Sequence, residues 1–146
     1  MHPARKRKRI SRNGIGIVNG YDLDDTLAKV EFSQASVRGL ATVYSQAKVL
    51  YRPEGRFVVI TARTHSTSAL KTATLNWLQD NYKNFVTIRY VPSGSEAAVG
   101  KAKAAIINAM RLDSYTDNNR DVLKAIGEYT DVPLYLLSGG HKTRIS

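Results

Sequence analysis

Short apolar runs rich in β-branched residues alternate along this chain with longer stretches in which apolar residues recur at helical spacing. Because strands that alternate with helices are joined by right-handed crossovers, this order predicts a parallel sheet covered by helices. We therefore expect an α/β protein with a parallel sheet of about five strands flanked by helices. The expected strands are 15–23, 56–60, 85–91, 112–116 and 133–137. Helices are expected at 33–50, 96–110 and 119–129, and a further helix has its apolar stripe over 70–78.

The composition restricts the class of protein further. The 146 residues, with 42% hydrophobic and 23% charged side chains, are typical of one globular domain. The chain has no cysteine, which excludes disulfides and a cysteine nucleophile and fits a reducing compartment. No apolar run reaches the roughly 18 residues of a membrane-spanning helix. We expect a cytoplasmic (intracellular) protein with no membrane partner.

Positive charge is concentrated at the N-terminus. The chain has 22 Lys and Arg against 12 Asp and Glu, and six of these cations lie within the first twelve residues, which contain no acid. We expect residues 1–13 to be a basic, disordered tail and residues 14–146 to form the folded domain. Such a tail favours DNA or RNA as a partner, because a polycation that binds phosphates releases counterions. A solvated tail that only aids solubility is the alternative.

Acidic side chains follow the first expected strand, and parallel sheets bind ligands beyond the carboxyl ends of their strands. Asp22 and Asp24 lie two residues apart, so an extended backbone would point both toward the same side. Two carboxylates so close repel each other unless a cation lies between them, and Mg²⁺ prefers such oxygen ligands. Asp117 after the fourth strand would add a third acid, Thr61 after the second strand a hydroxyl, and the helix at 96–110 a lysine.

Four motifs in this order resemble those of the haloacid dehalogenase superfamily. Residues 21–27, Tyr-Asp-Leu-Asp-Asp-Thr-Leu, resemble its first motif, and residues 58–63, Val-Val-Ile-Thr-Ala-Arg, resemble its second. Lys103 suits the third motif, with Lys101 as the alternative, and residues 115–121, Tyr-Thr-Asp-Asn-Asn-Arg-Asp, resemble the acidic fourth. The motifs extend over nearly the whole chain from Ile15 onward.

The resemblance implies a Rossmann-like fold and phosphoryl transfer to an aspartate. Asp22 would attack phosphorus and form an aspartyl-phosphate. Asp24 would protonate the leaving oxygen and then deprotonate the water that hydrolyses the intermediate. Mg²⁺ would be bound by the Asp22 carboxylate, the Asp24 backbone carbonyl and Asp117, while Thr61 and Lys103 would hold the phosphoryl oxygens.

Further residues of the motifs complete the predicted site. Thr26, Arg63 and Asn118 are expected to contact the substrate, as is Lys101 if Lys103 is the lysine of the third motif. Asp121 would support the metal site as an additional acid. Asn118 departs from the pattern, because many relatives have a second acid at this position, and the geometry of the metal site stays open for that reason.

The spacing of the motifs bears on the substrate. About 35 residues separate Thr26 from Thr61, and about 40 separate Thr61 from Lys103. Neither interval can hold the large cap domain that closes over small substrates in this superfamily. An open site and a basic tail favour nucleic-acid ends, and the first two motifs are similar to the 3′-phosphatase half of polynucleotide kinase-phosphatases, which implies a 3′-phosphate of DNA or RNA. The alternatives are a phosphatase of small nucleotides or other metabolites, and a nucleic-acid-binding or assembly protein with little activity.

Overall fold

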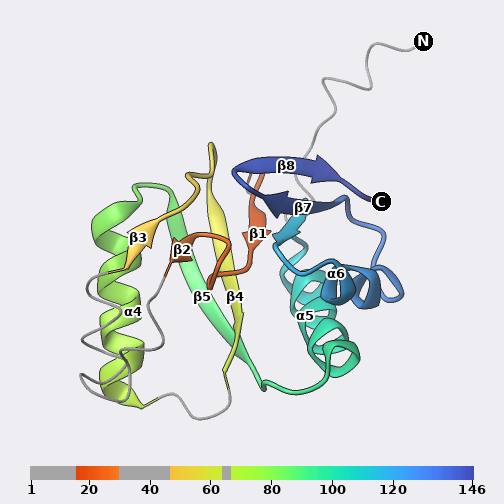
Figure 1. Ribbon diagram of the computed structural model, residues 1–146, viewed down its shortest axis with the longest axis horizontal. Coiled ribbons are helices and arrows are strands. Elements are labelled where there is room, and N and C mark those ends of the chain that lie inside the picture. The colour runs from red at the N-terminus through yellow and green to blue at the C-terminus, as the bar shows by residue number, and fades with distance from the viewer. Residues whose placement is uncertain (1–15, 30–46, 64–66) are drawn as a thin grey trace.

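The computed structural model describes residues 16–29, 47–63 and 67–146, so the basic tail expected at 1–13 lies outside the described residues. Six strands form the main sheet in the order β5-β4-β1-β6-β7-β8 (Figure 1). Five of them run parallel, and β8 is antiparallel to β7. The α/β prediction is confirmed, whereas the estimate of about five strands missed β8. The strands are β1 Asn19–Tyr21, β4 Phe57–Ala62, β5 Phe85–Val91, β6 Tyr115–Asp117, β7 Leu134–Ser138 and β8 His141–Arg144.

Helices cover the two faces of this sheet. The described helices are α4 Ser68–Asn81, α5 Glu96–Met110 and α6 Arg120–Gly127, with α4 on one side and α5 and α6 on the other (Figure 1). Alternate residues of β4 face the two cores: Val59 packs in the cluster that contains Trp77 of α4, and Ile60 in the cluster that contains Ile107 of α5. This burial on both faces explains the continuous apolar run of β4. None of the described helices is long and apolar enough to cross a membrane.

Side-chain caps define where the helices begin. The Thr67 side chain accepts a hydrogen bond from Leu70 N at 3.1 Å and begins α4. Asn119 caps α6 by accepting hydrogen bonds from the backbone N–H groups of Asp121 and Val122. These oxygens accept hydrogen bonds from N–H groups that have no partner within the first turn, and so they fix where each helix begins.

Three predicted elements were wrong by more than two residues at one end. The first strand, expected at 15–23, is β1 Asn19–Tyr21. The helix expected at 33–50 does not include its last residues: β3 Lys48–Val49 pairs antiparallel with β2 Ala28–Lys29, and residues 30–46 lie outside the described part. The pairing with β2, distant in sequence, overrides the helical spacing there. The fourth strand begins at Tyr115 instead of Leu112, because Arg111 ends α5 in the left-handed conformation (φ 54°) and the chain must then turn back to the sheet.

The C-terminal segment forms a hairpin that adds β8 to the edge of the sheet. Gly139 and Gly140 connect β7 to β8, and both have positive φ, 56° and 81°. Glycine adopts this conformation without strain, and two such residues in succession are typical of a tight hairpin turn. Lys142 of β8 then donates a hydrogen bond to the hydroxyl of Tyr21 at 2.7 Å and lies 4.8 Å from the ring centroid of Tyr135. The contact with Tyr21 fastens the hairpin to β1, a central strand of the sheet.

Candidate active site

The parallel strands bring two acids from distant parts of the chain to the same edge of the sheet. Strands β1 and β6 are neighbours, with Tyr21 paired to Thr116. Asp22 directly follows β1 and Asp117 ends β6. The backbone N–H of Asp22 donates to the carbonyl of Thr116 at 2.9 Å, which holds the two strand ends together.

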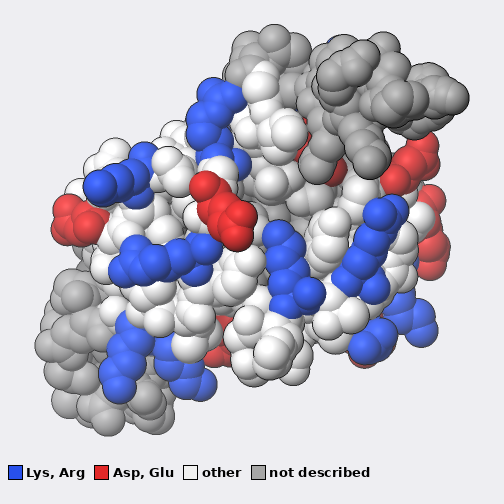
Figure 2. All heavy atoms as spheres, turned by 90° about the horizontal axis from the view of Figure 1, so that it is seen from above, with Lys and Arg blue, Asp and Glu red and all other residues white. Residues whose placement is uncertain are grey.

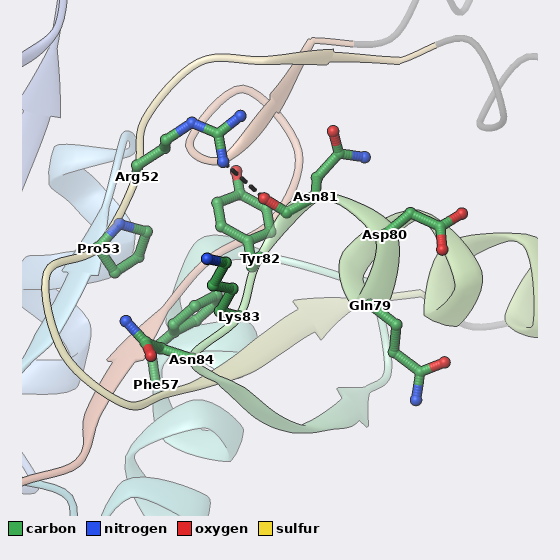
Figure 3. Close-up of a pocket in the computed structure, with 9 residues that line it drawn as sticks. All are labelled: Arg52, Pro53, Phe57, Gln79, Asp80, Asn81, Tyr82, Lys83 and Asn84. Carbon is green, nitrogen blue, oxygen red and sulfur yellow. Dashed lines mark hydrogen bonds between the residues drawn. The ribbon is translucent and has the colours of Figure 1, made fainter.

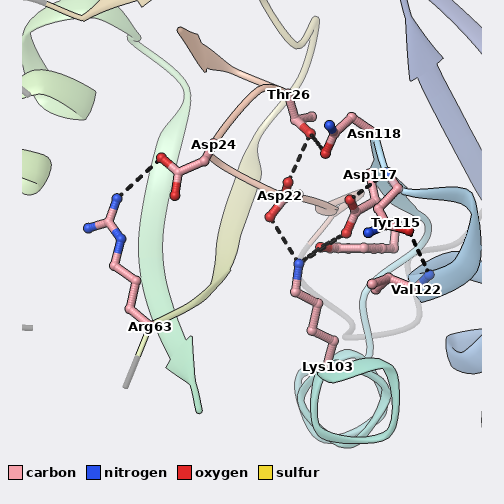
Figure 4. Close-up of polar contacts among 10 residues, drawn as sticks. Asp22, Asp24, Thr26, Arg63, Lys103, Tyr115, Asp117, Asn118 and Val122 are labelled. Atoms are coloured by element: carbon pink, nitrogen blue, oxygen red, sulfur yellow. Dashed lines mark hydrogen bonds and ion pairs between the residues drawn. The ribbon is translucent and has the colours of Figure 1, made fainter. Parts of the chain in front are cut away.

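Lys103 of α5 lies between these two acids (Figure 4). Its ammonium nitrogen is 3.0 Å from Asp22 Oδ1 and 3.0 Å from Asp117 Oδ2. One lysine therefore contacts both carboxylates. The group is buried, with exposures of 2% for Lys103, 2% for Asp117 and 9% for Asp22. The Tyr115 hydroxyl completes it by accepting from Lys103 at 2.7 Å and donating to Asp117 Oδ2 at 3.0 Å. Lys101 is exposed, and its ammonium lies 5.8 Å from the ring of Tyr129 instead.

The electrostatics of this group show a surplus of negative charge. Burial and then the charge of Asp117 raise the pKa of Asp22 to about 7, although Lys103 opposes the shift. Burial lowers the pKa of Lys103, but the two carboxylates outweigh it, so that the pKa rises and the lysine stays charged. Burial and the charge of Asp117 raise the pKa of Tyr115 well above its usual range, so its hydroxyl stays protonated. Two acids and one cation therefore lie in a site with little water to screen them.

Two further side chains satisfy the remaining carboxylate oxygens. The Thr26 hydroxyl donates to Asp22 Oδ2 at 3.0 Å, and the backbone N–H of Asn119 donates to Asp117 Oδ1 at 3.0 Å. The amide of Asn118 faces the same two oxygens. Oriented with its NH₂ group toward them, it donates at 3.2 Å to Asp22 Oδ2 and at 3.2 Å to Asp117 Oδ1. This orientation matches donors to acceptors, because ionised carboxylates only accept hydrogen bonds.

Asp24 contacts a different cation. Its Oδ1 lies 3.4 Å from Nη2 of Arg63. The other terminal nitrogen of Arg63, Nη1, donates to the Thr74 hydroxyl of α4 at 3.0 Å. The sequence had predicted that Asp22 and Asp24 point to the same side, but they reach Lys103 and Arg63 respectively (Figure 4). The reason lies in the backbone, because β1 ends at Tyr21 and the chain then turns instead of remaining extended.

The other predicted residues lie apart from the buried group. Thr61 is 1% exposed and lies on the same face of β4 as Val59. Ala62 lies on the opposite face and lines the cavity described next. Asp121 is exposed in the first turn of α6 and does not line that cavity. The structure thus brings together Asp22, Thr26, Lys103, Asp117 and Asn118 from the predicted set.

A cavity of about 210 Å³ borders the acids. Besides Asp22, Lys103 and Asp117, its lining includes residues that were not predicted as site residues: Ser93, Gly94, Glu96 and Asn119. The first three belong to the loop after β5 and the start of α5. The rule that ligands bind beyond the carboxyl ends of parallel strands could have indicated this loop, because it follows the third predicted strand.

The donors at this cavity fit a magnesium ion. In the described ranges, no three His, Cys, Asp or Glu side chains lie together as a metal-holding group. Asp22 and Asp117 nevertheless supply hard carboxylate oxygens, and their surplus charge calls for a second cation beside Lys103.

A larger cavity, about 350 Å³, lies at the other end of the sheet near the start of β4 (Figure 3). Arg52 donates to the backbone carbonyl of Asn81 at 2.5 Å and lies 5.6 Å from the Tyr82 ring centroid. The lining of this cavity contains one acidic residue, Asp80. Figure 3 shows its carboxylate pointing away from Arg52 and Lys83. This cavity has no paired carboxylates in its lining.

Comparisons with protein-family models, with curated proteins and with solved structures find no match for this chain. The residues themselves describe the site. Asp22, Asp117 and Lys103 form a buried ion cluster, and it borders a cavity at the ligand-binding edge of a parallel sheet. Such an arrangement can hold a divalent cation and present a carboxylate to a phosphate group.

Proposed function

We propose that this protein is a Mg²⁺-dependent phosphomonoester hydrolase that acts through an aspartyl-phosphate on Asp22. The proposal rests on one observation, the buried cluster in which Lys103 contacts both Asp22 and Asp117 beside the cavity. Lys103 favours the ionised form of Asp22, and only the ionised carboxylate has a lone pair suited to attack on phosphorus. The cluster thus holds the nucleophile in place, and Lys103 opposes the rise of its pKa that burial and Asp117 cause.

Each step assigns a role to a residue of the chain. A carboxylate oxygen of Asp22 forms the bond to phosphorus while the bond from phosphorus to the leaving oxygen breaks. Asp24 gives its proton to that oxygen, then takes one from the water that attacks the aspartyl-phosphate and releases phosphate. Asp22, the backbone carbonyl of Asp24 and Asp117 would hold Mg²⁺, which supplies positive charge against the phosphoryl oxygens.

The size of the cavity favours a phosphate at the end of a macromolecule. Its volume of about 210 Å³ is below the roughly 300 Å³ of pockets that enclose a small-molecule ligand. The rest of the substrate would therefore lie outside it. The net charge of +10 favours nucleic acid, and six of the cations lie in the first twelve residues. Figure 2 views the molecule from the end opposite the cavity, where acidic and uncharged side chains separate the Lys and Arg residues. We assign the nucleic-acid contact to the N-terminal segment because its first twelve residues contain six cations and no acid.

Purified protein is expected to hydrolyse 4-nitrophenyl phosphate with Mg²⁺, to stop with EDTA and to recover when Mg²⁺ is restored. Asp117→Asn should lower the rate at least about a hundredfold, because it removes a charged metal ligand. Asp131→Asn is the matched control, since Asp131 is exposed and does not line the cavity. Activity that survives in the Asp117→Asn protein, or that ignores EDTA, would contradict the proposal.

The substrate class is tested in the same assay. A 3′-phosphorylated oligonucleotide should be turned over faster than the corresponding free nucleotide, and deletion of residues 1–13 should reduce this preference and its dependence on salt. Faster turnover of the free nucleotide would instead assign the protein to small substrates.

Arg63 offers a prediction about the proton donor. Its side chain is only 11% exposed, and it contacts both Asp24 and Thr74, so it holds the Asp24 carboxylate in one place. Arg63→Gln should therefore slow the hydrolysis of alkyl phosphates, which need a proton on the leaving oxygen, by about 10²-fold. Hydrolysis of 4-nitrophenyl phosphate should change much less, because 4-nitrophenolate leaves without a proton.

The control for this substitution is Arg89→Gln, an exposed arginine on the neighbouring strand β5. It should leave both rates unchanged. Equal slowing of both substrates by Arg63→Gln would show that Arg63 does not act through Asp24.

A further inference from the structure

The four oxygens of Asp22 and Asp117 form two pairs, and one donor group bridges each pair. Lys103 bridges Asp22 Oδ1 and Asp117 Oδ2 at 3.0 Å each. The NH₂ group of Asn118 bridges the other two, Asp22 Oδ2 and Asp117 Oδ1, at 3.2 Å each. The amide thus contacts the two carboxylate oxygens that Lys103 does not contact.

The two bridges differ in charge. Lys103 neutralises one of the two carboxylates, whereas the Asn118 amide satisfies hydrogen bonds and adds no net charge. A divalent cation beside Asp22 Oδ2 and Asp117 Oδ1 would neutralise the second carboxylate. The amide hydrogens of Asn118, however, point at these same two oxygens. A cation and the NH₂ group therefore compete for Asp22 Oδ2 and Asp117 Oδ1.

A rotation of the amide alone can end this competition. Asn118 is exposed, so its side chain has room to turn. With its carbonyl oxygen in the place of the NH₂ group, Oδ1 accepts from the Thr26 hydroxyl at 3.3 Å. That hydroxyl otherwise donates to Asp22 Oδ2 at 3.0 Å, and it has a single hydrogen. One rotation therefore removes two donors from Asp22 Oδ2 and presents an oxygen in their place.

We infer that the Asn118 amide regulates metal loading: its NH₂ group closes the metal site in the metal-free protein, and binding of Mg²⁺ requires the amide to turn its oxygen inward, with the Thr26 hydroxyl following it. This inference rests on the proposed function, because it concerns the same magnesium site. It assigns to Asn118 a role that a carboxylate at this position could not have, since a carboxylate has no hydrogens to compete with the metal.

The test compares binding of Mg²⁺ by calorimetry in wild type, Asn118→Asp and Asn84→Asp. Asn118→Asp removes the competing donors and adds a third carboxylate, so it should bind Mg²⁺ at least about tenfold more tightly than wild type. Without metal it should melt at a lower temperature than wild type, because a third acid then lies beside two others, and Mg²⁺ should reverse the loss. Asn84→Asp adds the same charge at the far end of the sheet and should behave as wild type.

Proton exchange gives a readout that does not involve activity. In the metal-free protein the NH₂ hydrogens of Asn118 are bonded to two carboxylates, so their NMR signal should exchange slowly with water. Mg²⁺ should shift this signal and speed its exchange, while the amide signal of Asn84 stays unchanged.

Two failures are distinguishable. If wild type binds no Mg²⁺, or binds it equally well after Asp117→Asn, the proposed metal site itself is wrong. If wild type binds Mg²⁺ through Asp117 but the Asn118 signal does not respond and Asn118→Asp binds no more tightly, the role of Asn118 is overturned and the hydrolase proposal stands.

Discussion

The Asp22→Asn protein is expected to fold, to lose more than about 10³-fold of the phosphatase activity of wild type, and to be more stable than wild type in metal-free buffer at pH 8. The activity falls because an amide cannot form the aspartyl-phosphate. The stability rises because the substitution removes one of two buried negative charges that share a single lysine.

The gain in stability should depend on pH in a defined direction. The pKa of Asp22 in the folded protein, about 7, lies above its ordinary value, so the native state retains this proton at pH values where the unfolded chain has lost it. The favourable contribution is full below the ordinary pKa and is lost as pH rises through about 7. Asparagine stays neutral throughout, so its advantage in free energy of unfolding should be largest at pH 8, smaller near pH 5 and absent only below the ordinary pKa of 3.8.

Urea unfolding at pH 5 and pH 8, with hydrolysis of 4-nitrophenyl phosphate measured on the same preparations, checks both parts. Asp131→Asn serves as the control for the loss of one exposed acid. Unchanged activity in the Asp22→Asn protein would mean that Asp22 is not the nucleophile. A stability gain of equal size at both pH values would mean that buried charge is not its cause.

Replacement of Lys103 should have the largest effect on stability. Lys103→Met leaves Asp22 and Asp117 buried and close together with no cation between them, and the Tyr115 hydroxyl loses its donor. Removal of one partner from a buried ion pair costs about 3–5 kcal/mol. We expect a loss of free energy of unfolding of this size at pH 8 in metal-free buffer.

The matched control lies on the same helix two residues earlier. Lys101 is exposed, and its ammonium lies 5.8 Å from the ring centroid of Tyr129, so Lys101→Met should change the free energy of unfolding by no more than about 1 kcal/mol. Addition of Asp117→Asn to Lys103→Met should restore part of the stability, because one of the two uncompensated charges is then gone. Similar losses for Lys103→Met and Lys101→Met would contradict the ion cluster.

The part of the fold that local patterns encode could be predicted from the sequence. The apolar run at 57–60 is buried on both faces, and Asn119 begins α6 at the start of the helix expected at 119–129. The pairing of β2 with β3 could not be predicted, because it depends on a contact between segments distant in sequence. The hairpin at Gly139 and Gly140 was missed although its signal, two adjacent glycines between strand-like runs, was present.

Some residues of the candidate site could likewise be predicted from the sequence, and others could not. Asp22, Asp117 and Lys103 could be selected because each occupies a position that the strand and helix order brings to one edge. Tyr115 was not selected, because the strand pattern says only that it is buried and not that its hydroxyl reaches Lys103. The divergence of Asp24 toward Arg63 depends on a turn after β1, which the extended pattern did not indicate.

The most direct test of the magnesium and aspartyl-phosphate proposal is a crystal structure with Mg²⁺ and beryllium fluoride, a mimic of a bound phosphoryl group. The proposal predicts the fluoride complex attached to a carboxylate oxygen of Asp22, one Mg²⁺ ion shared by Asp22 and Asp117, and Lys103 still in contact with the cluster. An unmodified Asp22 with no ion between it and Asp117, at saturating concentrations of both reagents, would contradict it.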